Sequence, residues 1–340
     1  MPKIAYVHAS SIGTYNYYLV FQHLREELAR IADVKFYTVP RPWEENDPPL
    51  FDARKIVQEF EPDAIIIGVN NTVHRSISHM KDINCLKIMM SDDPHNWLER
   101  QAKFMEKSKI DIMLMMNYGK WYGKPEDYPI FWKEPFTLAS ARPKEIYGGM
   151  IPIADKYQRL LNYQCKFINF PESVNTDFFK DRGYVRDCDV FNSGSFCSSV
   201  YPLRCLIYEK LKNHPKIKCC IQPRFAYSWN EYADMLARTK MLTEGVGVFG
   251  YTSQRFFQAM ASKALVVASL PYDNIDNHFI PNENFVEINK DNVVEKVLYY
   301  LKHEDERKKI VESAYQIILK YHTVQIRARQ LIDIIKENLK

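Results

Sequence analysis

The sequence predicts an α/β protein built from parallel sheets, and three observations point to this class. Short apolar runs such as residues 62–69 (PDAIIIGV) recur along the 340-residue chain. Stretches with helical spacing of apolar residues, such as 17–31, stand between these runs. A second series of the same kind begins near residue 187. Alternating strands and helices are typical of parallel strands joined by right-handed crossovers, so two such units are expected.

The first half reads as one sheet with its crossover helices. Four prolines in residues 40–50 predict a surface loop, and four more between 121 and 149 predict an ordered insertion without a regular unit. The expected strands are 3–8, 34–39, 62–69, 86–90, 110–116 and 166–170, and the expected helices are 17–31, 51–60 and 97–107.

The second half reads as another unit of the same type. Residues 193–195 (Ser-Gly-Ser) follow its first strand as a tight turn, and Pro202 suits the first turn of a helix. The expected strands are 188–192, 217–221, 240–243, 264–268 and 285–288. The expected helices are 202–212, 231–238, the one that begins near Ser253, 293–303, 305–321 and 323–339.

Composition limits the classes of function. The net charge of +4 comes from 46 basic and 42 acidic residues, which is too weak to argue for nucleic acid but suits a phosphorylated small ligand. The seven cysteines form no C-x-x-C pair, so we expect reduced cysteines in a cytoplasmic protein. No apolar run approaches the roughly 20 residues of a membrane span, so no transmembrane segment is expected. The oligomeric state stays open.

The stretch 255–267 (RFFQAMASKALVV) resembles the nucleotide-sugar motif of GT-B glycosyltransferases, close to R-x-F-E-A-M-A-x-G-x-x-V-V. The similar groups are the CgeB-like, or spore-maturation-type, enzymes and the glycosyltransferase family 4-like group. Gln258 stands where these families usually have Glu, and Lys263 where they usually have Gly. The resemblance implies two facing Rossmann-like domains. Residues 1–170 would bind the acceptor, residues 171–322 would bind the nucleotide sugar, and a helix at 323–340 would pack back toward the first domain.

The resemblance also implies a site for the sugar donor. The helix that begins near Ser253 offers free N–H groups and a partial positive charge to a diphosphate. Plain helix capping by Thr252 or Ser253 is the alternative. Gln258 would contact the ribose. Arg204 is expected to face solvent, and Lys263 is expected in a left-handed conformation. The expected donor-binding residues are Gly194, Ser195, Arg224, Tyr251, Thr252, Ser253, Arg255 and Gln258.

The first domain would supply the catalytic groups. Asp92, Asp93 and His95 follow a buried strand, where one of them could act as a base. Capping of the next helix by Asp92 or Asp93 is the alternative. His8 and Gly13 border the first strand, where the resemblance places the acceptor. No histidine cluster has metal-ligand spacing, so neither a metal nor a cofactor is expected.

The sequence therefore predicts a glycosyltransferase that moves a sugar from a nucleotide-sugar donor to an unknown acceptor. Gln258 favours one rival, a non-catalytic protein that binds nucleotides or sugars on the same scaffold. A second rival is a glucosyltransferase-type enzyme acting on modified DNA bases, which would need a continuous basic groove.

Overall fold

The computed structural model describes residues 1–9, 19–39, 49–68, 76–91, 98–116, 153–196, 201–223, 227–246 and 250–339. The described residues divide into two compact units. Residues up to 116, 153–171 and 324–339 form unit 1, and residues 172–323 form unit 2. The chain enters unit 2 at Glu172 and leaves it at Thr323. A parallel bridge between Val174 and Thr323 pairs the segment by which the chain enters unit 2 with the segment by which it leaves.

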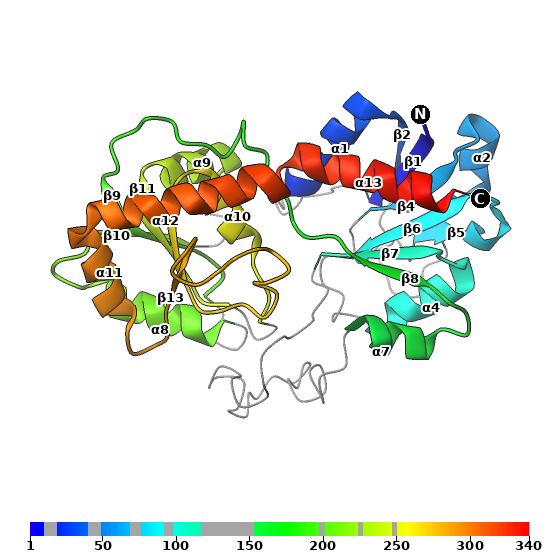
Figure 1. Ribbon diagram of the computed structural model, residues 1–340. Helices are drawn as coiled ribbons and strands as arrows, with labels where there is room; N and C mark the ends of the chain where they lie inside the picture. The colour runs from blue at the N-terminus through cyan, green and yellow to red at the C-terminus, as the bar shows by residue number, and fades with distance from the viewer. Residues whose placement is uncertain are drawn as a thin grey trace. The chain divides into compact units, whose positions relative to one another are not determined.

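Unit 1 contains a six-stranded parallel sheet in the order β2-β1-β4-β6-β7-β8 (Figure 1). Its main strands are β1 (Lys3–Ala9), β2 (Asp33–Val39), β4 (Ala64–Ile67), β6 (Leu86–Ser91), β7 (Ile112–Met115) and β8 (Lys166–Asn169). The strands β3 (Phe51–Asp52) and β5 (Ile77–Ser78) pair separately. The helices are α1 (Leu19–Ile31), α2 (Arg54–Phe60), α4 (Leu98–Ser108), α7 (Ile153–Leu160) and, at the end of the chain, α13 (Val324–Asn338).

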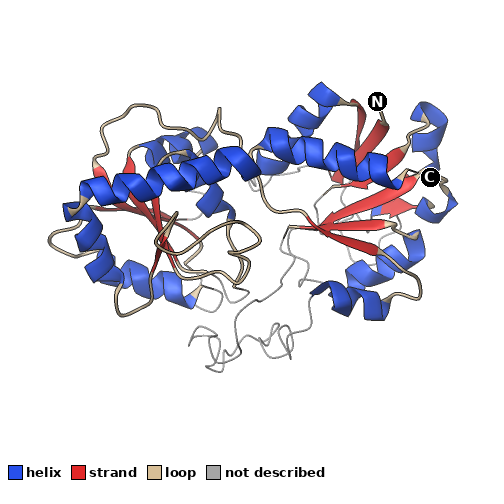
Figure 2. Ribbon diagram, in the orientation of Figure 1, coloured by secondary structure: helices blue, strands red, loops and turns tan. Residues whose placement is uncertain are grey.

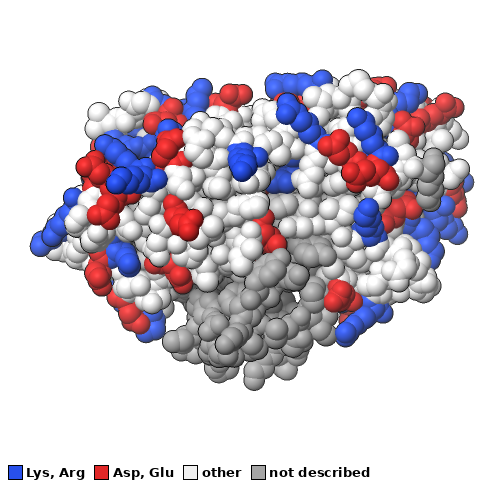
Figure 3. Space-filling model, in the orientation of Figure 1, with Lys and Arg blue, Asp and Glu red and all other residues white. Residues whose placement is uncertain are grey.

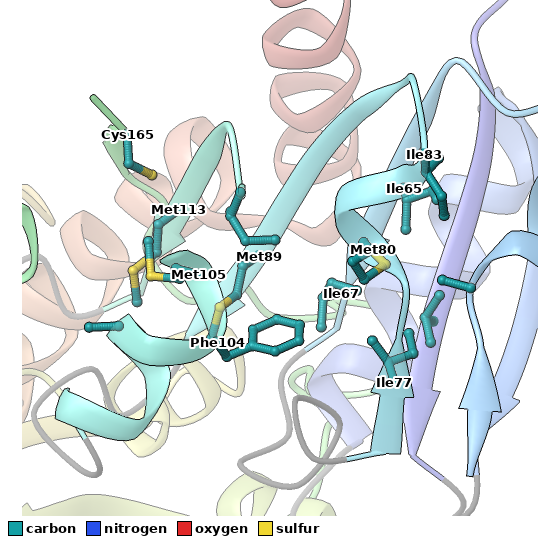
Figure 4. Packing of buried hydrophobic residues seen from close by; sticks show 14 of the residues in the cluster. Ile65, Ile67, Ile77, Met80, Ile83, Met89, Phe104, Met105, Met113 and Cys165 are labelled. Carbon is teal, nitrogen blue, oxygen red and sulfur yellow. The ribbon is translucent and has the colours of Figure 1, made fainter. Parts of the chain in front are cut away.

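Both faces of the unit 1 sheet are buried. Successive side chains of a strand point to opposite faces, so Ile65 and Ile67 of β4 enter one apolar cluster and Ala64 and Ile66 enter the other. Figure 4 shows part of the first cluster, where Ile67 and Met89 of the sheet lie against the surrounding elements. Burial on both faces explains why these strands read as continuous apolar runs.

The last helix completes the second of these clusters. Ala328, Leu331 and Ile335 of α13 are buried together with Leu24 and Leu28 of α1. The spacing of the three α13 residues, at i, i+3 and i+7, places them on one side of the helix. The core of unit 1 thus contains residues from both ends of the sequence.

Unit 2 contains a five-stranded parallel sheet in the order β10-β9-β11-β12-β13, with helices on both faces (Figure 2). Its strands are β9 (Cys188–Gly194), β10 (Cys219–Pro223), β11 (Thr239–Glu244), β12 (Leu265–Ala268) and β13 (Val286–Glu287). Its helices are α8 (Pro202–Leu211), α9 (Trp229–Ala237), α10 (Gln254–Ala261), α11 (Val293–Lys302) and α12 (Glu304–Ile317). A π-helix, Ile318–His322, follows α12 directly.

The two parallel sheets confirm the predicted α/β class. One expectation about the cysteines is wrong, because Cys188 of β9 and Cys220 of β10 form a disulfide. Pairing of the two strands brings their Cα atoms to 6.2 Å, which no local pattern in the sequence signals. The described cysteines outside this disulfide are Cys85, Cys165, Cys205 and Cys219.

Lys263 adopts the expected left-handed conformation after α10, with φ of 55°. Its Nζ lies 2.9 Å from Glu312 and 4.5 Å from the ring centre of Tyr315. Lys263→Gly and Lys263→Ala both remove these contacts. The difference between their free energies of unfolding therefore measures the cost of positive φ for a residue with a Cβ atom. We expect the Gly variant to have the higher free energy of unfolding by about 1 kcal/mol, because Gly adopts positive φ freely. Urea unfolding of the two variants measures this, and equal stabilities would contradict it.

Candidate functional site

The carboxyl ends of β9 and β11 meet at one edge of the unit 2 sheet. β9 is the first strand of the unit in sequence and lies between β10 and β11, so the connections diverge on either side of it. Ligands of open parallel sheets bind at such a point, outside the carboxyl ends of the strands. β9 ends at Gly194 and β11 ends at Glu244, which places both residues at this edge.

Glu244 holds two arginines at this edge. Arg204, near the start of α8, donates from Nε to the Glu244 carboxylate at 3.1 Å. Arg255, in the first turn of α10, donates from Nη2 at 3.2 Å and also from Nε. Arg204 and Glu244 are each 1% exposed and Arg255 is 22% exposed. The carboxylate therefore ties the N-terminal ends of two helices together in a nearly dry environment.

Two positive charges face one negative charge in this cluster. Burial would raise the pKa of Glu244, but the charges of Arg204 and Arg255 outweigh it and hold that pKa below its ordinary value. The cluster thus carries one net positive charge. Because Arg255 is partly exposed, this charge is available to an anion at the start of α10.

Gly194 allows the backbone to approach the two arginines. A Cβ atom at this position would lie 2.7 Å from Nη1 of Arg255 and 3.2 Å from Nη1 of Arg204. The φ angle of Gly194 is +108°, which L side chains rarely adopt. The next residue, Ser195, accepts a hydrogen bond from Nη1 of Arg204 at 2.8 Å through its carbonyl oxygen. The predicted turn is therefore part of the arginine cluster.

Thr252 is bound inside the protein before α10 begins. Its backbone N–H donates to Oδ1 of Asp273 at 2.8 Å, and its hydroxyl donates to the same oxygen at 2.6 Å. Ser253 occupies the N-cap position without a side-chain capping bond, and its Oγ has no hydrogen-bond partner among the described residues. The Ser253 hydroxyl, and not that of Thr252, is therefore free for a ligand.

Gln258 lies one turn into α10 and is 1% exposed. Its Nε2 has no hydrogen-bond partner within the part of the chain that the structure describes. A buried amide nitrogen without an acceptor costs free energy, which a ligand oxygen would recover. This unsatisfied group lies on the same short helix as Ser253 and Arg255.

The remaining predicted residues fall into two groups. The ring of Tyr251 meets that of Tyr272 edge-on at 6.5 Å, and Nε2 of His8 lies 3.3 Å from the hydroxyl of Thr38 in unit 1. The expected residues that lie outside the described residues are Gly13, Asp92, Asp93, His95 and Arg224.

The predicted environment of Arg204 is wrong, and two carboxylates of the site, Glu244 and Asp273, were not predicted. Arg204 was expected to face solvent, yet its spacing to Ile207 and Leu211 is that of a helical stripe, and both of these are buried. Glu244 is the last residue of a buried strand at the ligand edge, which was the available signal. Asp273 lies in the loop after β12, where no local pattern marks it.

No three His, Cys, Asp or Glu side chains among the described residues lie close enough together to hold a metal ion. No described helix is both long enough and apolar enough to cross a membrane.

Residues 204–333 match a family model described as "Glycosyl transferase-like". This stretch contains Arg204, Glu244 and all of α10, so the match includes the arginine cluster. It covers less than half of the chain. No curated protein matches the chain.

Solved structures match over nearly the whole chain. A glycosyltransferase from Rickettsia africae has a TM-score of 0.63 at 12% identity, covering 100% of this chain and 99% of that one. Anabaena Alr3699/HepE in complex with UDP-glucose has a TM-score of 0.59 at 9% identity, covering 99% and 100%. An alpha-glucosyltransferase in complex with UDP and a 13-mer DNA has a TM-score of 0.59 at 9% identity, covering 99% and 100%. These similarities show that the chain has the GT-B fold.

Proposed function

We propose that this protein is a glycosyltransferase that transfers a sugar from a nucleotide-sugar donor to an acceptor hydroxyl or amine. The observation that carries the proposal is the arginine cluster around Glu244. It carries one net positive charge at the carboxyl edge of the unit 2 sheet, beside the N-terminus of α10. The match of 204–333 to a glycosyl transferase-like model supports it, as do similar structures that bind UDP and UDP-glucose.

The sugar donor would bind to unit 2 through its diphosphate. Arg255 and the first-turn N–H groups of α10 would neutralise the phosphates, and the Ser253 hydroxyl would add a hydrogen bond. Gln258 would bind a ribose hydroxyl through its unsatisfied Nε2. The other donor-binding residues in this proposal are Gly194, Ser195, Arg224, Tyr251 and Thr252, the last acting through its backbone position.

Unit 1 would bind the acceptor and supply the base. We assign the base to one of Asp92, Asp93 and His95, and the acceptor contacts to His8 and Gly13. No metal is required in this proposal, because arginines and helix N–H groups hold the leaving diphosphate. We also place the protein in the CgeB-like group and in the cytoplasm, on the strength of the motif at 255–267 and the reduced state of most described cysteines.

Hydrolysis of the sugar donor tests the proposal. Purified protein is incubated with UDP-, GDP- and dTDP-sugars, and release of the nucleoside diphosphate is followed. Melting temperature is measured in parallel with the same compounds, since a ligand at about 100 times its dissociation constant stabilises a protein by roughly 2.7 kcal/mol. Stabilisation without turnover would favour the non-catalytic rival. Neither stabilisation nor turnover with any nucleotide would overturn both.

Gln258→Ala is expected to raise the dissociation constant of the bound nucleoside diphosphate about tenfold. One hydrogen bond to a ribose hydroxyl contributes about 1 to 1.5 kcal/mol, which corresponds to that factor. Pyrophosphate has no ribose, so its affinity should not change. Gln316→Ala, which removes a glutamine from the exposed side of α12, is the control. Titration calorimetry measures both ligands, and equal loss for both would contradict the ribose contact.

The DNA-modifying rival has a structural neighbour, the alpha-glucosyltransferase bound to DNA. On the face that Figure 3 shows, however, the described Lys and Arg side chains are interspersed with Asp and Glu. A DNA-binding enzyme would show duplex affinity that falls steeply with salt. Absence of such binding in a filter assay would remove this rival.

A further inference from the structure

Asp273 lies behind the start of α10, in the loop that follows β12. Its side chain is 4% exposed, and both carboxylate oxygens are used. Oδ1 accepts the N–H and the hydroxyl of Thr252, and Oδ2 accepts Nδ2 of Asn277 at 3.0 Å. The Asp273 carboxylate therefore holds Thr252 by two hydrogen bonds, one from the Thr252 backbone and one from the Thr252 side chain.

Asn277 closes this arrangement into a triangle. Asn277 is 3% exposed, and its Nδ2 also donates to the Thr252 hydroxyl at 3.2 Å. The hydroxyl thus donates to Asp273 and accepts from Asn277, which fixes its rotation. A backbone bond from Tyr272 to the carbonyl of Gly250, 2.8 Å, ties the same two loops together.

The triangle is anchored on its far side by the π-helix. Nε2 of His322 donates to the backbone carbonyl of Asn277 at 2.9 Å, and the His322 ring packs edge-on against Phe257 of α10 at 5.0 Å. The backbone N–H of Asn277 donates to the carbonyl of Asp273 at 3.1 Å. The loop therefore keeps a fixed place relative to both α10 and the π-helix.

We propose that Asp273 and Asn277 are positioning residues for the sugar donor, because they hold Thr252 so that the first N–H groups of α10 and the Ser253 hydroxyl point at its diphosphate. This inference rests on the proposed function. It assigns neither residue a contact with the ligand, since the described hydrogen bonds of their side chains go to Thr252 and to each other. Anion binding at a helix N-terminus depends on the direction of these N–H groups, so a small displacement of Thr252 weakens it.

The test compares Asp273→Asn with a double variant in which Asp273 and Asn277 are exchanged. Asp273→Asn keeps the size of the side chain but sets its NH₂ group against that of Asn277. We expect the dissociation constant of the nucleoside diphosphate to rise about tenfold. In the double variant Asp273→Asn, Asn277→Asp the new amide can donate from Nδ2 to the new carboxylate, and its carbonyl oxygen can still accept the Thr252 N–H. The Thr252 hydroxyl then has an acceptor on each side but only one proton to donate, so one of its two hydrogen bonds is lost. The double variant should therefore recover part of the affinity that Asp273→Asn loses. Calorimetry with UDP, GDP and dTDP at pH 7.5 measures this.

A control in the same loop separates positioning from stability. Asn284 is 2% exposed, accepts the N–H of Ile280 and donates to the carbonyl of His278. Asn284→Leu removes a buried loop contact of the same type without touching Thr252. It should lower the melting temperature and leave the dissociation constant unchanged.

The possible results are distinct. Weakened binding in Asp273→Asn with recovery in the double variant supports the positioning role. Unchanged binding in Asp273→Asn, or equal loss in Asn284→Leu, overturns it while the proposed function stands. A parent protein that binds none of the three nucleotides overturns the proposed function, and the positioning role with it.

Discussion

Glu244→Gln is expected to lower the free energy of unfolding by about 3–5 kcal/mol. The substitution keeps the shape of the side chain but removes the only negative charge that the described residues place against Arg204 and Arg255. Arg204 is 1% exposed, so its guanidinium would stay buried without a counter-charge. Removing one partner of a buried ion pair costs about 3–5 kcal/mol of stability, because the remaining charge stays buried without a counter-charge. Guanidinium chloride unfolding followed by circular dichroism measures the loss.

An exposed ion pair provides the matched control. Glu209 lies on α8, the helix that carries Arg204, and its carboxylate is 2.6 Å from Nζ of Lys212. Glu209 is 58% exposed, so Glu209→Gln should change the free energy of unfolding by less than about 1 kcal/mol. Similar losses in the two variants would show that burial of the Glu244 cluster does not govern its contribution.

Asp273 is expected to make the protein less stable as the pH rises from about 4 to about 6. Burial raises the pKa of Asp273 to about 6, although the bonds from Thr252 and Asn277 act in the opposite direction. In the unfolded chain the group titrates near its ordinary value of 3.8. Between these values the folded protein binds more protons than the unfolded one, so its stability falls with increasing pH. A difference of about 2 pKa units corresponds to about 3 kcal/mol.

The comparison with Asp273→Asn isolates this effect. The neutral amide does not titrate, and its altered hydrogen bonds shift the stability equally at every pH. Urea unfolding at pH 4, 5, 6 and 7.5 should show the variant gaining about 3 kcal/mol relative to the parent over this range. Asp291→Asn is the control, since Asp291 is 72% exposed. A constant difference between parent and Asp273→Asn would show that the carboxyl group titrates alike in the folded and unfolded states.

The parallel strands were predictable because strands that are buried on both faces have continuous apolar runs in the sequence. Residues 62–69 and 86–90 are continuous apolar runs, and the structure places β4 and β6 there as neighbours. The helix after residue 253 was predictable from its apolar spacing, and Lys263 from the position where a helix usually ends in Gly. These features depend on residues close together in the sequence.

The candidate site was less predictable because its contacts are long-range. Arg204 meets Glu244 across 40 residues, and Thr252 meets Asp273 across 21. Sequence periodicity identifies which face of a helix is buried, but not which distant charge lies there. The disulfide between Cys188 and Cys220 depends on strand pairing in the same way. The edge of the sheet could be located from the sequence, whereas the ion pairs and hydrogen bonds at that edge could not.

The packing of α13 in unit 1 has a consequence for synthesis of the protein. Leu331 and Ile335 fill part of the same cluster as Ile4 and Leu24, although the ribosome makes them more than 300 residues after Ile4. The strands of the unit 2 sheet, which lie within residues 172–323, are synthesised between these contributions, so this sheet can form first. The residues around Ile4 are therefore synthesised long before their core can be completed, and until then part of the apolar surface of unit 1 stays uncovered.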